Sequence, residues 1–344
     1  MSPVTALTAL GGGRGDAARA RSGALIQRQG ALIALVALIA FGTLRYGSDF
    51  ATGFNVQSLL ADDAKYALVA LGMTLVIMTG GIDLSVGSVA ALGGVVAVQL
   101  SDRGFVPAVL GALLVGAAVG SVNAFLITRL RLQPFIVTLA TLLAVRGLAL
   151  TVADVKAAVA DPDSGFQGLA SWSALGIPVS ALSVLALYLF VAGVSRYTPF
   201  GRQVLAVGGN EDASRLMGLR VDRIKAAVYV ISGALAGLAG AFLAAQSGSV
   251  ATAAGQGWEL SAIAAVVVGG TLLTGGVGSV MSTLVGVVLL QLLFNLIIFE
   301  NSKQVITISP YWESVIRGAF LLVVVLLQVR LVRGRRPAGA GGSP

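Results

Sequence analysis

Long apolar runs, separated by short polar or glycine-rich segments, dominate the chain. The runs are each roughly 15 to 23 residues long, which suits helices that cross a hydrocarbon layer of about 30 Å at 1.5 Å per residue. Runs such as 31–41 and 321–327 do not alternate apolar and polar residues, as transmembrane β-strands would. Because helices satisfy their own backbone hydrogen bonds in lipid, the pattern predicts an all-α, polytopic membrane protein.

The pattern predicts about ten membrane segments, which together form one transmembrane domain over residues 29–329. The expected segments are 29–44, 64–80, 84–100, 105–127, 134–153, 178–194, 226–246, 259–274, 277–299 and 313–329. Three polar regions are expected to be cytoplasmic: a flexible basic N-terminus (1–28), a long loop (196–225) and a basic tail (330–344).

Two pairs of predicted segments, 64–80 with 84–100 and 259–274 with 277–299, are so closely spaced that their connections are expected at membrane depth. The first junction reads Thr79-Gly80-Gly81-Ile82-Asp83-Leu84-Ser85-Val86-Gly87-Ser88, and the second reads Thr274-Gly275-Gly276-Val277-Gly278-Ser279. Transporters often pair broken helices across a pseudo-symmetry axis. The likeness of the junctions therefore predicts two broken or half-membrane helix pairs and indicates an internal repeat.

Charge asymmetry predicts the orientation of the chain. If both termini face the cytoplasm, most of the 23 basic residues fall on the inner side, whereas the few in outer loops are diluted by acidic residues. This distribution obeys the positive-inside rule. Trp172, Trp258 and Trp312 fall at the outer ends of predicted segments, where indole rings are expected at the headgroup level.

Composition agrees with a bilayer as the solvent, because 56% of the 344 residues are hydrophobic and only 11% are charged. The chain has no cysteine and no histidine, which excludes disulfides, metal sites built from these residues and histidine acid–base pairs. A membrane enzyme is therefore disfavoured. The net charge of +8 reflects topology, since the basic residues flank apolar runs, and no nucleic-acid partner is expected.

Asp83 is the carboxylate most deeply enclosed by apolar sequence. A charge in hydrocarbon costs about 2.5 to 3.5 kcal/mol on insertion scales, so such a residue usually faces a cavity or a partner. Two interpretations remain open: Asp83 lies on a translocation pathway, or it caps a helix that begins at Leu84 by accepting hydrogen bonds from backbone donors.

Further polar residues within apolar runs are candidates for the pathway. Arg146 lies inside such a run, where it pairs with a carboxylate, lines a polar path or snorkels to the membrane surface. Polar residues also hold helices together without binding substrate. Together with Asp83 and Arg146, the candidates are Thr79, Gly80, Gly81, Ser85, Ser88, Gln246, Glu259, Thr274, Gly275 and Asn295.

The long inner loop contains a predicted short helix after Asn210, a favourable N-cap residue, and before Gly218, a favourable stop. This helix would expose Leu216 and Met217 with Ala213 on one side. Such an apolar patch on a cytoplasmic loop indicates a docking surface, although the helix could instead lie on its own membrane domain. The candidate coupling residues are Asn210, Glu211, Ala213, Arg215, Leu216, Met217 and Gly218.

The chain has no nucleotide-binding motif of the P-loop type. That motif requires a lysine directly after a glycine, and none of Lys65, Lys156, Lys225 and Lys303 follows one. If ATP drives the protein, a separate subunit must hydrolyse it and must bind an inner loop.

Four motifs in order resemble the permease family of bacterial ribose, xylose, arabinose and galactofuranose ABC importers. They are the run 72–88, the run 133–141, the stretch from 198–202 through 209–211 to 217–219, and the glycine motif 269–278. The resemblance covers about 60 to 330 and excludes the extreme ends. Detail around Gly209-Asn210-Glu211, 272–278 and Trp312 is most similar to a galactofuranose permease subunit.

The resemblance implies a permease in the bacterial plasma membrane that works by alternating access. It implies a second permease subunit, identical or not, a cytoplasmic ATPase that uses the ATP, and an extracytoplasmic sugar-binding protein. Residues 210–218 would dock on the ATPase, and the permease would bind no cofactor itself. Two alternatives remain: a branched-chain amino acid ABC permease, and an ion-coupled secondary transporter that uses Asp83 or Arg146.

Overall fold

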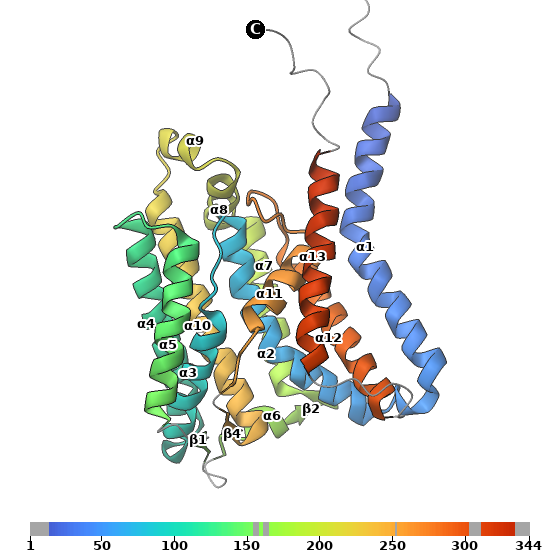
Figure 1. Ribbon diagram of the computed structural model, residues 1–344, viewed down its shortest axis with the longest axis vertical. Coiled ribbons are helices and arrows are strands. Elements are labelled where there is room, and N and C mark those ends of the chain that lie inside the picture. Colours follow the sequence, from blue (N-terminus) through green and yellow to red (C-terminus); the bar gives the residue numbers. More distant parts are fainter. Residues whose placement is uncertain (1–13, 154–157, 161–164, 252, 303–310, 334–344) are drawn as a thin grey trace, which may run out of the picture.

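The computed structural model describes residues 14–153, 158–160, 165–251, 253–302 and 311–333, which form a helical bundle (Figure 1). The longer helices are α1 (Arg14–Tyr46), α2 (Gly53–Met78), α3 (Val86–Gln99), α4 (Phe105–Thr128), α5 (Pro134–Val152), α7 (Val179–Tyr197), α8 (Pro199–Gly209), α10 (Val221–Ser247), α11 (Trp258–Val268), α12 (Val280–Ser302) and α13 (Tyr311–Arg333). Short helical elements are η2 (Gly47–Asp49), η3 (Ser101–Arg103), α6 (Gly168–Ser171) and α9 (Glu211–Leu216).

Each of the ten apolar ranges expected from the sequence overlaps one helix: α1 to α5, α7 and α10 to α13. Within the described residues, six helices are long and apolar enough to cross a membrane, and α3 and α11 are shorter apolar helices. The protein is thus all-helical and polytopic. α1 begins at Arg14, so helix extends into the N-terminal segment that was expected to be flexible.

Small residues let α10 pass through the centre of the bundle between α3 and α4. Gly233 and Gly237 of α10 face Ala112, Gly116 and Gly120 of α4, and both sets repeat every four residues. A Cβ atom on Gly237 would lie 2.1 Å from the carbonyl oxygen of Ala112, so the two backbones touch there. This spacing is typical of close helix packing in membranes, where association depends on backbone proximity.

The two closely spaced helix pairs, α2 with α3 and α11 with α12, are present, and the first helix of each pair ends in the same way. The location of their connections at membrane depth stays a prediction. Gly80 (φ 78°) ends α2 and Gly270 (φ 89°) ends α11 in the left-handed region. The amide of Gly81 donates to Val76 O over 3.1 Å, and that of Thr271 donates to Val266 O over 3.2 Å. This Schellman geometry supports the internal likeness. The structural counterpart of Gly80 is nevertheless Gly270, which lies before the second junction, and not a glycine within that junction.

The elements at the two ends of the bundle differ in kind (Figure 1). α9, the start of α1 and the end of α13 lie at one end, and α6 and the strands lie at the other. The strands form two antiparallel pairs: β1 (Ala158–Val159) with β4 (Ser249–Val250), and β2 (Ser173–Ala174) with β3 (Ile177–Pro178). The all-α expectation omitted these two-residue pairings, because they are too short to give a periodic pattern.

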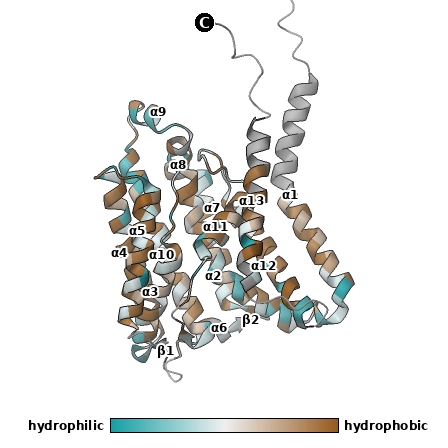
Figure 2. Cartoon of the chain, in the orientation of Figure 1, coloured by the Kyte–Doolittle hydropathy of each residue, from teal (hydrophilic) through white to brown (hydrophobic). Residues whose placement is uncertain are grey.

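Between the two ends, the long helices consist largely of hydrophobic residues (Figure 2), and many of these residues are exposed. Examples are Leu114 on α4, Leu143 on α5 and Phe190 on α7, which are 64%, 66% and 67% exposed. Exposed apolar side chains on long apolar helices are expected where lipid is the solvent. Trp172 and Trp312 are also exposed, but Trp258 is buried against Tyr66, with ring centroids 4.9 Å apart. Trp258 thus packs within the protein instead of facing outward, and its position at the headgroup level stays a prediction.

Candidate translocation and coupling sites

Asp83 lies in the connection between α2 and α3 and is completely enclosed by protein, with 1% of its surface exposed. Its Oδ1 atom accepts hydrogen bonds from the hydroxyl of Ser85 (2.6 Å) and from the Ser85 amide (3.1 Å). Its Oδ2 atom accepts from the hydroxyl of Ser232 on α10 (2.9 Å). Three donors therefore compensate for the loss of water around this carboxylate.

The hydrogen bonds of Asp83 continue across two more helices. The Ser85 hydroxyl, which donates to Asp83, accepts from the amide nitrogen of Asn123 on α4 (3.0 Å). The Asn123 carbonyl oxygen accepts from the hydroxyl of Thr141 on α5 (2.7 Å). We call Asp83, Ser85, Asn123, Thr141 and Ser232 the Asp83 network. From Thr141 through Asn123 and Ser85 to Asp83, each residue donates a hydrogen bond to the next one. Hydrogen bonds arranged in such a chain strengthen one another.

The geometry of Asp83 agrees with the capping interpretation, because its carboxylate accepts a backbone amide just before α3. The helix itself begins at Val86 instead of Leu84, and Ser85 is the N-cap residue. Ser88, another pathway candidate, donates its hydroxyl to the carbonyl of Ser85 within the first turn. A role of these residues in translocation stays a prediction.

Three glycine segments meet where the first broken pair approaches the inner loop. They are Gly80, at the end of α2, Gly208 and Gly209, at the end of α8, and Gly275 and Gly276, between α11 and α12. The amide of Gly276 donates to the carbonyl of Met78 over 3.0 Å. We call these five glycines the glycine joint.

Side chains would not fit into most of the glycine joint. A Cβ atom on Gly208 would lie 1.9 Å from Met78 O, and one on Gly275 would lie 2.7 Å from Gly80 N. Gly275 and Gly276 also have positive φ angles of 81° and 75°. Glycine is the residue that meets both conditions. The candidates Gly80 and Gly275 are thus brought together, and Thr79 and Thr274 adjoin them in the chain.

Arg146 and Glu259 form a second polar cluster, between α5 and the start of α11. The half-buried guanidinium of Arg146 donates to the carbonyl of Ala254 and interacts electrostatically with Glu259. Glu259 Oε2 is buried without a hydrogen-bond partner in the described part of the chain and lies over Gly87, where a Cβ atom would be 2.6 Å away. Asp154, near which the Arg146 run was expected to end, lies outside the described residues.

The remaining pathway candidates are not assembled with these clusters. Gln246, at the end of α10, donates to Asp62 (2.8 Å) and accepts from Lys65 (2.7 Å), so it ties α10 to α2. Asn295 on α12 donates to Asn55 over 3.4 Å. Gly81 packs against the hydroxyl of Tyr229. Within the described residues, the twelve candidates thus fall into separate groups.

The inner loop contains α8 and the predicted short helix, which is α9. Asn210 caps α9, since its side chain accepts from the amide of Ala213 over 2.9 Å. Gly218 follows with φ 80°, and Leu219 N donates back to Ser214 O, which completes a Schellman motif. Leu216 is 90% exposed and Met217 is 69% exposed at the tip of the molecule. The predicted helix and its exposed apolar patch are therefore present.

Ion pairs hold α9 against the start of α10. Arg215 Nη2 lies 3.0 Å from Glu211 Oε1 and 2.6 Å from Asp222 Oδ1, and Lys225 Nζ lies 2.7 Å from Glu211 Oε2. Burial by itself would raise the pKa of Glu211. The hydrogen bonds and charges of Lys225 and Arg215 outweigh this effect and hold that pKa below its ordinary value. Glu211 thus stays ionised at neutral pH, and the patch is presented on a fixed support.

Sequence reasoning missed several residues that the structure brings into these sites. Asn123, Thr141 and Ser232 complete the Asp83 network, and Gly208 and Gly209 complete the glycine joint. Asn123 gave a usable signal, because an amide within an apolar membrane helix usually has a partner. For Gly208 and Gly209 the sequence gives no sign that other backbones pack against them, because glycine is also common at helix ends without such contacts.

A polytopic helical bundle with an exposed helical patch at one end is typical of the subunits of membrane transport proteins. Comparison with known proteins identifies the family. A family model described as "Branched-chain amino acid transport system / permease component" matches residues 55–325. No solved structure matches the chain.

Three similar proteins illustrate the range of the family. The ribose import permease protein RbsC of Bacillus subtilis (strain 168) is 36% identical over 308 residues, which cover 88% of this chain and 93% of that protein. The L-arabinose ABC transporter permease protein AraH of Azospirillum brasilense is 38% identical over 314 residues, or 90% of each chain. The fructose import permease protein FruG of Bifidobacterium longum (strain NCC 2705) is 33% identical over 317 residues, or 88% and 91%.

The chain belongs to this family of ABC transporter permeases. It is a multi-pass membrane protein and a transport subunit, and not an enzyme.

Proposed function

We propose that the chain is the membrane-spanning subunit of an ABC importer for a monosaccharide in a bacterial inner membrane. The similar proteins named for ribose, L-arabinose and fructose support a pentose or hexose as substrate. The motif resemblance adds galactofuranose to the sugars to be tested. The family description names branched-chain amino acids, so these are the competing substrate class.

The ten apolar helices act as one conduit that opens alternately to either side of the membrane. The two broken pairs, α2 with α3 and α11 with α12, supply the polar backbone that such a conduit needs at membrane depth. The pathway candidates near these junctions, Asp83, Arg146 and Glu259 among them, gate it. A second permease subunit completes the conduit, and an extracytoplasmic binding protein delivers the sugar.

The apolar patch on α9, formed by Leu216 and Met217 beside Ala213, docks on a cytoplasmic ATPase. Leu216 and Met217 are large apolar residues exposed on a short helix that its N-cap and ion pairs hold in place. Contact with a protein partner would remove these side chains from water, which is favourable. The chain lacks a P-loop, so the ATPase subunit supplies the hydrolysis. This arrangement requires α9, and both ends of the chain, to face the cytoplasm.

The glycine joint transmits the movement of the ATPase into the membrane. Gly208 and Gly209 directly precede α9, and they touch the backbone of both broken junctions at Met78 and Gly276. Backbones packed this closely have no flexible side chains between them to absorb a displacement. A shift of α9 therefore moves the end of α2 and the connection between α11 and α12 together.

Uptake into vesicles tests the proposed function. The chain is reconstituted with its co-expressed ATPase and binding protein, and radiolabelled ribose, arabinose, fructose, galactofuranose and leucine are supplied with internal or external ATP. We expect one of the sugars to accumulate only with ATP and all subunits. Accumulation of leucine alone would favour the amino acid alternative, and uptake by the chain alone under an ion gradient would contradict the proposal.

Docking is tested with the double variant Ala213→Asp and Leu216→Asp. We expect the ATPase no longer to co-purify, because two carboxylates replace the apolar patch. The matched control is Leu175→Asp, which changes a fully exposed leucine at the opposite end of the molecule and should leave co-purification unchanged. Normal co-purification of the double variant would argue against docking at α9.

A further inference from the structure

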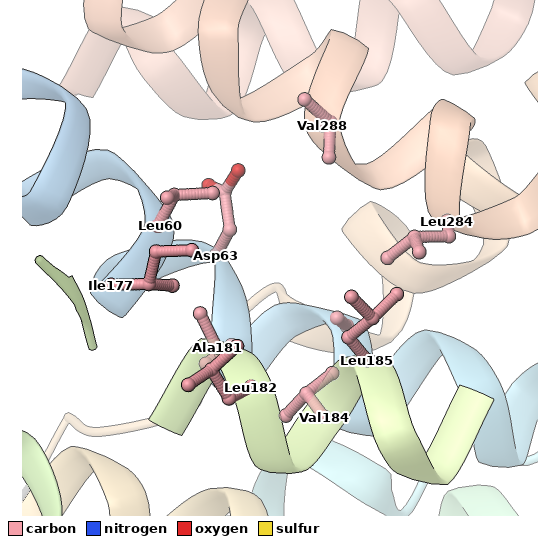
Figure 3. A pocket seen from close by; sticks show the side chains of 11 residues that line it. Leu60, Asp63, Ile177, Ala181, Leu182, Val184, Leu185, Leu284 and Val288 are labelled. Carbon is pink, nitrogen blue, oxygen red and sulfur yellow. The ribbon is translucent and has the colours of Figure 1, made fainter. Parts of the chain in front are cut away.

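A cavity between α2, α7 and α12 has one polar residue, Asp63, in an otherwise apolar lining (Figure 3). Its volume is about 250 Å³. Leu60, Asp63, Ala64 and Ala67 recur at the spacing of one helix face, so the turns of α2 present this stripe to the cavity. Ile177, residues of α7, and Leu284 and Val288 of α12 close the other sides. We call this cavity the Asp63 pocket.

The carboxylate of Asp63 has no hydrogen-bond partner among the described residues. Asp63 is 5% exposed, and neither of its carboxylate oxygens accepts a hydrogen bond within the part of the chain that the structure describes. The nearby ammonium of Lys65 is bound by Asp62 (2.5 Å) and Gln246 (2.7 Å) instead. In Figure 3 the Asp63 carboxylate points into the space that the labelled side chains enclose. A buried acceptor without a donor is costly, so a ligand that supplies a donor would be stabilised there.

The lining decides what kind of ligand fits. A monosaccharide carries several hydroxyl groups, and a single carboxylate would leave most of them without partners. A largely apolar cavity of about 250 Å³ has room for a short alkyl chain. The ligand therefore has an alkyl chain and one cationic donor.

The pocket is reached from the outer surface of the bundle. Ile177 and Leu185 on its lining are 39% and 42% exposed, and Leu189 and Phe190 continue an exposed apolar surface along α7. On a multi-pass membrane protein such a surface faces lipid. A ligand dissolved in the bilayer can thus enter from the side without crossing the conduit.

We propose that the Asp63 pocket binds a membrane amphiphile that has a single alkyl chain and a protonated amine. The amine donates to the carboxylate of Asp63, and the chain occupies the apolar space between α7 and α12. A bound amphiphile would pack against the first half of α2, and the connection to α3 follows the C-terminal end of the same helix. The proposal rests on the pocket alone and is independent of which substrate the protein imports.

Photoaffinity labelling of the whole chain in phosphatidylcholine vesicles tests the proposal. The probe is decylamine with a diazirine in its alkyl chain, and labelled peptides are located by mass spectrometry. We expect labelling within 60–67, 177–188 or 284–288, and competition by unlabelled decylamine at concentrations at least tenfold lower than by decanol or decanoate. Labelling elsewhere only, or equal competition by all three, would overturn the proposal without any variant.

Single substitutions then separate the role of the Asp63 carboxylate from that of the apolar space. Asp63→Asn should weaken labelling about tenfold, the loss expected when an ion pair becomes a neutral hydrogen bond. Ala181→Phe fills the pocket and should abolish labelling. The control Asp102→Asn changes an exposed carboxylate away from the pocket and should label like the wild type. Wild-type labelling of both Asp63→Asn and Ala181→Phe would disprove the site.

Discussion

Hydrogen-bond donors compensate for the water that a carboxylate loses inside a membrane domain, and Asp83 illustrates this at the scale of single residues. Three donors bind its two oxygens, and the bonds reach α4, α5 and α10 through Asn123, Thr141 and Ser232. The broken connection between α2 and α3 is thereby tied to three helices. The same residue thus anchors the junction, whether or not substrate passes nearby.

The Asp83 network makes a prediction about stability. Asp83→Ala leaves three buried donors without an acceptor and should lower the free energy of unfolding by roughly 3 kcal/mol or more, whereas Ser232→Ala should cost about 1 kcal/mol. Denaturation of the purified protein in detergent micelles measures both. Asp102→Asn, at an exposed position, is the control. A pathway role without an anchoring role would appear as an Asp83→Ala variant that keeps wild-type stability but loses uptake.

At the scale of elements, the two broken pairs resemble each other through their helix ends and differ in the turns that follow. Both α2 and α11 end with a left-handed glycine and the same hydrogen bonds, at Gly80 and Gly270. The later turn at Gly275 and Gly276 then packs on Gly80 and on the end of α8. One broken pair thus contacts the other through the glycine joint, and α8 contacts both.

Adjacent glycines at the end of α8 allow a matched test of the joint. Gly208→Ala places a methyl group where Met78 O and Gly276 N already lie, whereas the Cβ atom of Gly209→Ala meets nothing within 4 Å. We expect Gly208→Ala to reduce ATP-driven uptake at least tenfold while the ATPase still co-purifies. Gly209→Ala should transport like the wild type. Equal uptake by the two variants would exclude transmission through this contact.

At the scale of the whole molecule, the arrangement gives the two ends different roles. α9 and the adjoining ends of α1 and α13 lie at one end, and α6 with the β-strand pairs lies at the other (Figure 1). Basic residues of the inner loop, Arg202, Arg215, Arg220 and Arg223 among them, are at the α9 end. The positive-inside rule then predicts that this end faces the cytoplasm.

The absence of cysteine from the sequence makes this orientation simple to measure. Leu216→Cys at the tip of α9 and Leu175→Cys in the turn between β2 and β3 change residues that are 90% and 103% exposed. In intact cells with permeabilised outer membranes, a membrane-impermeant maleimide should label Cys at 175 and not at 216. Inverted vesicles should give the opposite result. Labelling of position 216 from outside would refute the proposed topology and, with it, docking of a cytoplasmic ATPase.

Much of the helical framework was predictable, because apolar run length and helix-stop residues are local properties. The ten ranges, the short helix capped by Asn210 and the exposure of Leu216 and Met217 are all found in the structure. The site was less predictable. Asp83 was singled out, but the bonds that tie its network to α4, α5 and α10 join residues 38, 18 and 149 positions apart, and no local pattern encodes such contacts.

The sequence by itself determined that this is a multi-pass helical membrane protein and, through its motifs, which family it resembles. Burial of apolar runs in lipid and the backbone requirements of glycine act over a few residues, so they can be read along the chain. Only the tertiary structure decided that Asp83 is enclosed and not open to a cavity, that Gly208 meets two broken junctions, and that Asp63 faces an apolar pocket. These features depend on which helices pack together, and packing joins residues that are far apart in the chain.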